Sequence, residues 1–300
     1  MISIIVPVYN GEHYLRRNFE SLMSQSCLDF EVIYINDGSV DNSEFILKEL
    51  VRSHSAKCRL VSTKNQGVML ARKLGVSLAK FDYITFLDID DILDCDFIST
   101  FISEIKFSNC DIICTNFKLS KYNKISYSKS LKENEYSNEN FIKSLCVNGG
   151  WELCGKVYRK KIFDDIKYSS KISIGEDALV LFQLVFFSKN IKVLDNYLYT
   201  YIDNSNSASN VWDVERCRDG LLAGLYIKNF LMNKGVIDLK YLNSLMLLFF
   251  SNSLTRGLIK NNDFLFKELR GAINFNSLSL LPIKKRIIVI VGFILTGLNF

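Results

Sequence analysis

The first 120 residues alternate between two patterns of apolar positions. Runs rich in β-branched residues begin near Ser3, Glu31, Arg59, Tyr83 and Asp111, and such runs favour β-strands. Between them, apolar residues recur at helical spacing, as at Leu15, Phe19, Leu22, Met23, Leu70, Leu74 and Leu78. Strand starts roughly 25 to 30 residues apart with helices between them indicate right-handed β-α-β crossovers. The pattern predicts an α/β fold with a mostly parallel sheet flanked by helices.

The pattern changes character after residue 118. Residues 118–145 are rich in Lys, Ser, Asn and Tyr, which predicts a loop or an irregular connection. Gly175-Glu176-Asp177 then opens an apolar helix from Ala178 to Phe187, and the Asn- and Ser-rich stretch from Tyr201 to Asn210 predicts a mobile loop. We therefore expect an α/β half over residues 1–120, a second half of the same domain over 121–210, and a helical extension over 211–300.

The C-terminus joins a basic triplet, Lys284-Lys285-Arg286, to an apolar stretch from Ile287 to Phe300. That stretch is shorter than the roughly 20 apolar residues of a membrane span. A short apolar helix beside cations suits attachment to the face of an anionic membrane. A buried terminal helix is the alternative.

Composition narrows the class of protein. The 300 residues are 48% apolar and 23% charged, which is ordinary for a folded protein. A formal charge of +5, spread along the chain, makes nucleic acid a poor candidate partner. Eight cysteines form no C-x-x-C pair and only two histidines occur, so we expect a reducing compartment and no zinc site. The start of the chain looks like a strand and not a secretory leader, which favours a cytoplasmic location.

Polar residues collect where predicted strands end. Val8-Tyr9-Asn10 ends the first strand, Asn36-Asp37-Gly38-Ser39 the second, and Asp88-Ile89-Asp90 the fourth. In an open parallel sheet, ligands bind beyond these carboxyl ends. Two carboxylates separated by one residue can hold Mg²⁺ or Mn²⁺, and such an ion commonly also binds a diphosphate.

Three common ligand-binding motifs are excluded at these strand ends. The carboxylate run from Asp88 would need an oxygen ligand and then Gly where Ile92 and Leu93 stand to form a calcium loop. Neither G-x-G-x-x-G nor G-x-x-x-x-G-K-[ST] occurs in the chain, so the usual glycine-rich phosphate cradles are absent. Phosphate would be bound by a metal ion and side chains.

Taken together, four motifs match a known family. They are the segments Ser3–Asn10, Asp29–Asp41, Asn65-Gln66-Gly67 and Leu87–Asp91. In this order they resemble the family 2 inverting glycosyltransferases of GT-A fold. Two later segments, Lys156–Arg159 and Gly175-Glu176-Asp177, are similar to family features, and residues 206–300 carry no recognisable motif.

The resemblance implies roles for several residues. Asp37 would accept from the N3–H of uracil in a nucleotide sugar, with Pro7 and Tyr9 beside the base and ribose. Asp88 would lie near the ribose or the metal shell, and Asp90 would ligate Mn²⁺ or Mg²⁺.

Other expected roles have structural alternatives beside them. Arg72 would face the nucleotide, or be a solvated helix cation. Asp91 could instead cap a helix starting at Ile92. Asp177 would be the general base that deprotonates the acceptor hydroxyl, with Glu176 as the alternative base, although acids also favour helix starts.

Three further residues are open between binding and packing. Trp151 is either a platform for the acceptor sugar or a packing residue. Lys156 and Arg159 would meet a diphosphate, or a lipid-linked pyrophosphate, or be surface cations.

The expected function is transfer of a sugar from a nucleotide donor, UDP-linked, to a hydroxyl of a lipid-linked glycan at the cytoplasmic face of the membrane. A capsule or O-antigen pathway suits this residue usage. A sugar nucleotidyltransferase is the alternative enzyme, although Asn10-Gly11-Glu12-His13 lacks its glycine-rich basic loop. A catalytically silent scaffold subunit is the non-enzyme alternative.

Overall fold

The structure is a computed structural model that describes residues 1–122, 124–128, 132–168, 172–203, 213–235, 237–254 and 264–295. The chain forms two compact units. Unit 1 comprises Met1–Ser137, Glu152–Ser170 and Phe187–Asn204, and unit 2 comprises Asn138–Trp151, Lys171–Phe186 and Ser205–Phe300. The sequence-based division at residues 120 and 210 stays a prediction.

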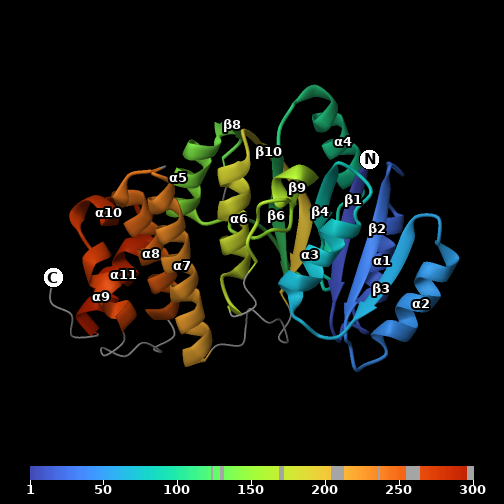
Figure 1. Ribbon diagram of the computed structural model, residues 1–300, viewed down its shortest axis with the longest axis horizontal. Helices are drawn as coiled ribbons and strands as arrows, with labels where there is room; N and C mark the ends of the chain where they lie inside the picture. The colour runs from blue at the N-terminus through green and yellow to red at the C-terminus, as the bar shows by residue number, and fades with distance from the viewer. Residues whose placement is uncertain are drawn as a thin grey trace. The chain divides into compact units, whose positions relative to one another are not determined.

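Unit 1 is built on one sheet. Its strands are β1 (Ile2–Val8), β2 (Phe30–Asp37), β3 (Cys58–Thr63), β4 (Tyr83–Phe86), β5 (Ile92–Leu93), β6 (Ile112–Lys121), β7 (Lys124–Ser128), β8 (Asn134–Ser137), β9 (Lys156–Arg159) and β10 (Asn190–Ile202). Over the described residues the strand order is β3-β2-β1-β4-β9-β6-β10-β5, with β7 beside β6 and β8 beside β10 (Figure 1). β1, β2, β3 and β4 pair in parallel, as do β6 and β10, and β9 runs antiparallel to β4 and β6. The predicted α/β fold with a sheet flanked by helices is confirmed. Parallel pairing holds for β1 to β4 and for β6 with β10, and the other described pairings are antiparallel.

Helices complete unit 1. They are α1 (Leu15–Met23), α2 (Ser43–Ser53), α3 (Val68–Leu78), α4 (Phe97–Phe107) and the 3-10 helix η1 (Lys160–Phe163). β1 and β2 are buried along their whole length, as expected for parallel strands covered on both faces. α3 lies close against β1 at Gly75, where a Cβ atom would come 2.3 Å from Cγ2 of Ile5. The glycine therefore fixes how near the helix approaches the sheet.

Unit 2 is helical over the described residues. It contains α5 (Asn138–Asn148), α6 (Glu176–Phe187), α7 (Val214–Lys234), α8 (Leu239–Leu254), α9 (Phe264–Ala272), α10 (Phe275–Leu280) and α11 (Ile283–Leu295). α8 contacts α5, α7, α9, α10 and α11, and its residues Leu245, Met246 and Phe250 are fully buried. This confirms the predicted C-terminal helices.

Two sequence-based expectations about local structure are wrong. The described part of residues 118–145 is mostly regular, because β6 continues to Lys121, pairs with β7, and is followed by β8 and α5. β7 is almost wholly exposed, so its polar residues resemble a loop in sequence. Asp91 caps no helix, because Ile92 begins β5, which pairs with β10.

The predicted mobile loop and tail are only partly covered by the structure. Tyr201 belongs to β10, and 204–210 lie outside the described residues. The apolar tail forms α11 as far as Leu295, and 296–300 lie outside the described residues. Among the described helices, none is long and apolar enough to cross a membrane.

Candidate functional site at the carboxyl edge of the sheet

The loops after β1, β2 and β4 leave the sheet at one edge. Val8 is paired with Asn36, and Ile5 with Phe86, so the three parallel strands end side by side. The segments that follow carry Tyr9, Asp37 and Asp88. This edge is where ligands bind in open α/β sheets.

Side-chain hydrogen bonds join the first two of these loops. Asn10 donates its backbone N–H to Ser39 Oγ at 3.0 Å, and its Oδ1 accepts from the Val40 N–H at 2.9 Å. Glu12 donates its N–H to Asp41 Oδ2 at 3.1 Å. Asn10 has a positive φ of 50°, a conformation that Asn tolerates better than most residues. These hydrogen bonds therefore hold the loop after β1 against the loop after β2.

Asp37 is the last residue of β2, and it is buried. Its Oδ1 accepts from the Gln66 N–H at 3.0 Å and from Thr63 Oγ1 at 3.3 Å, and its Oδ2 accepts from the Gly67 N–H at 2.8 Å. Gly67 is the N-cap of α3, so the carboxylate lies at the positive end of that helix. A carboxylate oxygen can accept two hydrogen bonds, so Oδ2 has capacity for one further donor.

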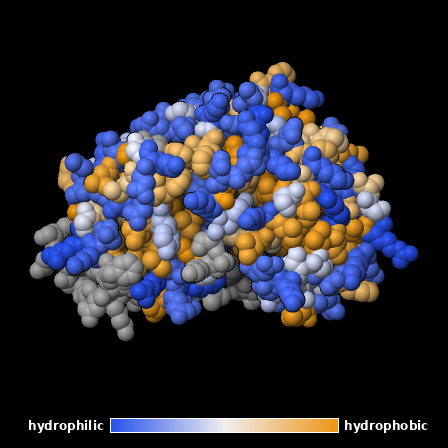
Figure 2. Space-filling model, viewed as in Figure 1, coloured by the Kyte–Doolittle hydropathy of each residue, from blue (hydrophilic) through white to orange (hydrophobic). Residues whose placement is uncertain are grey.

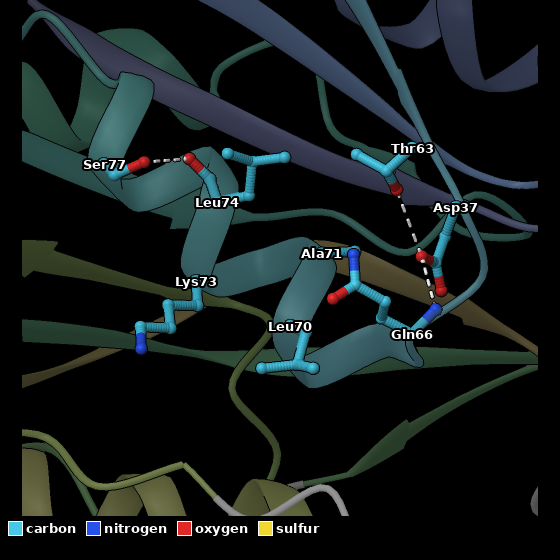
Figure 3. A pocket seen from close by; sticks show the side chains of 8 residues that line it. All are labelled: Asp37, Thr63, Gln66, Leu70, Ala71, Lys73, Leu74 and Ser77. Atoms are coloured by element: carbon cyan, nitrogen blue, oxygen red, sulfur yellow. Dashed lines mark hydrogen bonds between the residues drawn. The ribbon is translucent and has the colours of Figure 1, made fainter.

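A cavity of about 310 Å³ opens beside Asp37. One side of α3 lines it, and the ends of β2 and β3 contribute Asp37 and Thr63 (Figure 3). The lining residues are Asp37, Thr63, Gln66, Leu70, Ala71, Lys73, Leu74 and Ser77. Apolar side chains gather over α3 on the face shown in Figure 2. A mainly apolar cavity with one carboxylate suits a flat heterocycle that has an N–H donor.

Asp88 is held by side chains from two other segments of unit 1. Its Oδ1 accepts from Arg72 Nη2 at 2.7 Å, and its Oδ2 accepts from Cys154 Sγ at 3.2 Å. Arg72 is buried, and its guanidinium lies 5.7 Å from the centre of the Phe86 ring. Arg72 is therefore not a solvated helix cation, because its charge is held against Asp88.

The backbone of the turn from Asp88 to Asp91 is held from α1. Asn18 Nδ2 donates to the carbonyls of Asp88 at 3.1 Å and Asp91 at 3.0 Å. Arg17 Nη2 donates to the carbonyl of Asp90 at 2.7 Å. Three of the carbonyls in this turn, those of Asp88, Asp90 and Asp91, therefore receive side-chain donors from one helix.

Asp91 is held from β10 and not by a helix. Tyr199 donates its hydroxyl to Asp91 Oδ2 at 2.6 Å, and the Ile202 N–H donates to Oδ1 at 2.9 Å. Both Asp91 and Tyr199 are buried. Burial, and next the charges of Asp88 and Asp90, raise the pKa of Asp91 from 3.8 to about 8. The shift reflects mainly the burial of Asp91, with a smaller contribution from the two neighbouring carboxylates.

Comparison with known proteins shows the family of this chain. The model of the glycosyl transferase family 2 matches residues 3–167, which is more than half of the chain. The chain belongs to glycosyltransferase family 2. Glycosyltransferase GlyA of Streptococcus pneumoniae serotype 4 is 29% identical over 226 residues, which are 70% of this chain and 32% of that protein. This family 2 chain thus spans about a third of the length of that relative.

Solved structures agree on the fold. S. aureus TarS 1-349 in complex with UDP-GlcNAc has a TM-score of 0.73 and 19% identity, with 98% of this chain and 88% of that chain covered. Mannosyltransferase PcManGT from Pyrobaculum calidifontis in complex with GDP-Man and Mn2+ has a TM-score of 0.57 and 11% identity, with 99% and 86% covered. The family 2 chain therefore has the predicted GT-A fold.

The family 2 turn has a donor set that suits a hard divalent cation. Its side chains offer carboxylate oxygens, which Mg²⁺ and Mn²⁺ prefer as ligands. Burial, and after it the charges of Asp88 and Asp90, raise the pKa of Asp91, and a cation would offset that charge. Both oxygens of Asp88 accept from Arg72 and Cys154, and Asp90 as the metal ligand stays a prediction.

A second acidic group lies just beyond this turn. In the part of the chain that the structure describes, the one group of three side chains whose ligand atoms lie within 4.8 Å of one another is Asp94, Cys95 and Asp96. Lys118 forms an ion pair with Asp94, and Asp96 Oδ1 accepts from Ser26 Oγ at 2.9 Å. We assign no ion to it, since exposed acids with internal partners are common.

Asp177 and Trp151 belong to unit 2. Asp177 is half-buried in the first turn of α6, so its role as base stays a prediction. Trp151 stacks on Phe249 with ring centres 4.3 Å apart and donates its Nε1–H to the Leu145 carbonyl at 2.9 Å. Trp151 is therefore a packing residue within its unit.

Lys156 and Arg159 are not surface cations. Lys156 is fully buried, donates to the Glu152 carbonyl, and lies over the Phe117 ring. Arg159 donates its Nε–H to Asp111 Oδ1 at 2.9 Å. Arg159 pairs with Tyr83 at the start of β4, away from the carboxyl edge, so its contacts support the fold.

Sequence reasoning missed Asn18, Cys154 and Tyr199. Asn18 carried a usable signal, because it lies on the same buried helix face as Leu15 and Leu22, where a polar residue needs a specific partner. Cys154 and Tyr199 carried none, since their contacts join segments far apart in the chain.

Proposed function

We propose that this chain transfers a sugar from a UDP-sugar to a hydroxyl of a lipid-linked glycan in bacterial surface-polysaccharide synthesis, with inversion at the anomeric carbon. The observation that carries the proposal is the crowded carboxylate turn from Asp88 to Asp91 at the carboxyl edge of a family 2 domain. A cation bound at this turn would offset the repulsion between its carboxylates.

The donor's base would bind next to Asp37. The uracil N3–H would donate to Oδ2, which carries one hydrogen bond from Gly67. Tyr9, half-exposed, and the buried Pro7 follow from the adjacent strand. They do not line the cavity beside Asp37, so we assign them to the ribose side of the nucleotide.

Asp90 would hold Mn²⁺ or Mg²⁺ on the donor's diphosphate. When bound, the ion neutralises the charge that grows on the leaving diphosphate. Arg72 keeps Asp88 oriented by its 2.7 Å contact, so that Asp88 can meet the ribose or a water of the metal shell. α1 holds the backbone of the turn in place.

Asp177 would be the general base, with Glu176 as the alternative. Its carboxylate takes the proton of the acceptor hydroxyl as that oxygen bonds to the anomeric carbon. The bond from that carbon to the diphosphate breaks on the opposite face, and the diphosphate leaves with the bonding electrons. Attack opposite the leaving group inverts the configuration.

A uridine donor is preferred over a guanosine donor. The solved TarS structure with UDP-GlcNAc is the closer in fold of the two neighbours, with a TM-score of 0.73 against 0.57 for the GDP-Man complex. The cavity also offers the Asp37 carboxylate as an acceptor for the N3–H of a uracil imide. Capsule or O-antigen synthesis is the setting that we propose.

The test is donor hydrolysis by the purified full chain across UDP-, GDP- and dTDP-sugars with Mn²⁺. We expect one UDP-sugar to be consumed, and Asp90→Ala and Asp177→Asn each to reduce turnover at least a hundredfold. Asp96→Ala is the control for Asp90, and Glu176→Gln decides between the two candidate bases, because turnover should survive it if Asp177 is the base. Melting curves separate loss of catalysis from loss of folding.

Each outcome has one meaning. Consumption of a GDP-sugar alone overturns the assignment of uracil as the nucleobase of the donor. Release of a nucleoside triphosphate from a UDP-sugar and pyrophosphate would mark a nucleotidyltransferase. Metal-dependent binding without turnover, even with membrane lipid extract added as acceptor, would mark a silent scaffold.

A further inference from the structure

α11 exposes an unusual row of large apolar side chains. Ile283, Ile287, Val291 and Ile294 are 72%, 56%, 46% and 63% exposed. On a helix of 3.6 residues per turn these positions fall within about 80° of one another. They form one continuous stripe, which we call the α11 stripe.

The opposite face of α11 belongs to the core of unit 2. Val289 is fully buried, and Phe293 packs on Phe250 of α8 with ring centres 4.8 Å apart. The helix is therefore anchored by one face and presents the other outward. Contact through the α11 stripe would not require α11 to leave the fold.

Positive charge borders the stripe. At helical spacing, Lys284 and Arg286 flank it on either side in the first turn. Lys284 is exposed, and Arg286 Nη2 donates to the carbonyls of Ser279 at 2.7 Å and Leu281 at 3.2 Å. These bonds tie the start of α11 to the end of α10.

The surrounding sequence offers little negative charge. Residues 264–295 contain five basic residues and one acidic residue, Glu268. Glu268 Oε2 accepts from Lys228 Nζ of α7 at 3.5 Å. An apolar stripe bordered by cations is complementary to an anionic lipid surface, in which acyl chains take the apolar side chains and headgroups meet the exposed Lys284.

We propose that the α11 stripe is a docking surface for an anionic membrane, on which α11 lies in the plane of the headgroups. No described helix is long and apolar enough to span a bilayer, in keeping with a helix that lies on the surface. The proposal rests on the proposed function only in that a lipid-linked acceptor would be presented at such a surface.

The test is co-sedimentation of the full chain with vesicles of phosphatidylcholine alone and with vesicles that also contain phosphatidylglycerol. We expect binding to the anionic vesicles that weakens with salt. Ile287→Asp should lower the partition coefficient at least tenfold. Lys284→Gln should lower it about fivefold on anionic vesicles only.

The chain offers a matched control in unit 1. Ile125 of β7 is 61% exposed, close to the 56% of Ile287, so Ile125→Asp makes the same change outside the stripe and should leave vesicle binding unaltered. Circular dichroism checks that each variant is folded. Donor hydrolysis without vesicles is measured in parallel, because Ile287→Asp should leave it unchanged and a chain that lacks activity can still bind lipid.

Two results would overturn the proposal. One is equal binding to vesicles by the wild type and by Ile287→Asp. The other is absence of vesicle binding together with a dimer in sedimentation velocity that Ile287→Asp converts to monomer, which would assign the α11 stripe to a second copy of the chain.

Discussion

Tyr199→Phe tests whether the carboxylate turn depends on a donor from β10. The substitution removes one hydroxyl and keeps the ring, which contacts Phe117 with ring centres 5.3 Å apart. It deletes the 2.6 Å hydrogen bond to Asp91 Oδ2. It also deletes the oxygen that accepts from the Asp88 N–H at 3.4 Å.

The size of the effect depends on the charge of Asp91. Burial and the neighbouring carboxylates raise the pKa of Asp91 to about 8, so at pH 6 in metal-free protein the bond joins two neutral groups. Such a bond contributes about 1 kcal/mol. At pH 9 the acceptor is ionised, and the same bond contributes about 1.5 to 3 kcal/mol.

The sign follows from the direction of the pKa shift. Because the folded pKa of Asp91 lies above the unfolded value of 3.8, the stability that Asp91 contributes is greatest at low pH and is lost as pH rises through 8. The Tyr199 hydroxyl favours the ionised form and limits that loss. Without it, Tyr199→Phe should be destabilised more at pH 9 than at pH 6.

Tyr34→Phe is the matched control. Tyr34 is a fully buried residue of β2, and its hydroxyl has no hydrogen-bond partner among the described residues. Removing a buried hydroxyl that lacks a partner should leave stability unchanged or raise it. Removal of a buried tyrosine hydroxyl should therefore lower the free energy of unfolding at Tyr199 and not at Tyr34.

The assay is urea unfolding of metal-free protein at pH 6 and pH 9, followed by circular dichroism. Hydrogen exchange of unit 1 peptides is measured beside it, because the residues of unit 1 include no tryptophan whose fluorescence could report on the sheet. The reasoning fails if Tyr199→Phe is no less stable than Tyr34→Phe, or if its loss is equal at the two pH values.

Three further predictions follow from single sites. Gly38→Ala should lower the free energy of unfolding by at least about 1 kcal/mol, because φ is +71° and a Cβ atom would come 2.6 Å from the Asn65 nitrogen; thermal melts measure it. Asp90→Asn should stabilise metal-free protein by roughly 0.5 kcal/mol through lower repulsion, yet abolish the rise in melting temperature on adding Mn²⁺ with UDP. Only Cys95 and Cys27 should react quickly with Ellman's reagent, because the other six cysteines are buried.

Each of these predictions has a control and a contradicting result. Gly271→Ala lies in open space in α9 and should not destabilise, so equal losses at the two glycines contradict the steric argument. Asp96→Asn should keep the Mn²⁺ effect, and loss of the effect there but not in Asp90→Asn would move the ion. Burial raises the pKa of Cys114 to about 12, so rapid labelling of Cys114 in folded protein would contradict its burial.

The sheet was predictable because its signals are local. β1, β2 and β4 are continuous buried runs, which leave a clear record in the sequence. β7 was missed although Lys124–Ser128 alternates polar and apolar residues, because the segment is short, almost wholly exposed and flanked by polar residues. A strand that is specified by pairing with β6 and not by burial looks like a loop.

The residues of the site also fall into two groups, those that the sequence could place and those that it could not. Asp37, Asp88 and Asp90 could be placed at the sheet edge, because each directly follows a recognisable strand. The partner of Asp91 could not, since Tyr199 is 108 residues away and nothing local marks it. Local helix-capping rules favoured a role for Asp91 that a long-range hydrogen bond overrides.

The contacts around the carboxylate turn explain how unit 1 tolerates it. Arg72 supplies a full charge to Asp88, while Asn18 and Tyr199 supply dipoles to the turn. These donors reduce the repulsion without removing it, because the charges of Asp88 and Asp90 still add to the effect of burial in raising the pKa of Asp91. Part of the free energy for binding a cation at Asp90 would therefore come from relief of repulsion already present in the folded chain, and each donor that makes the turn more stable also makes that relief smaller.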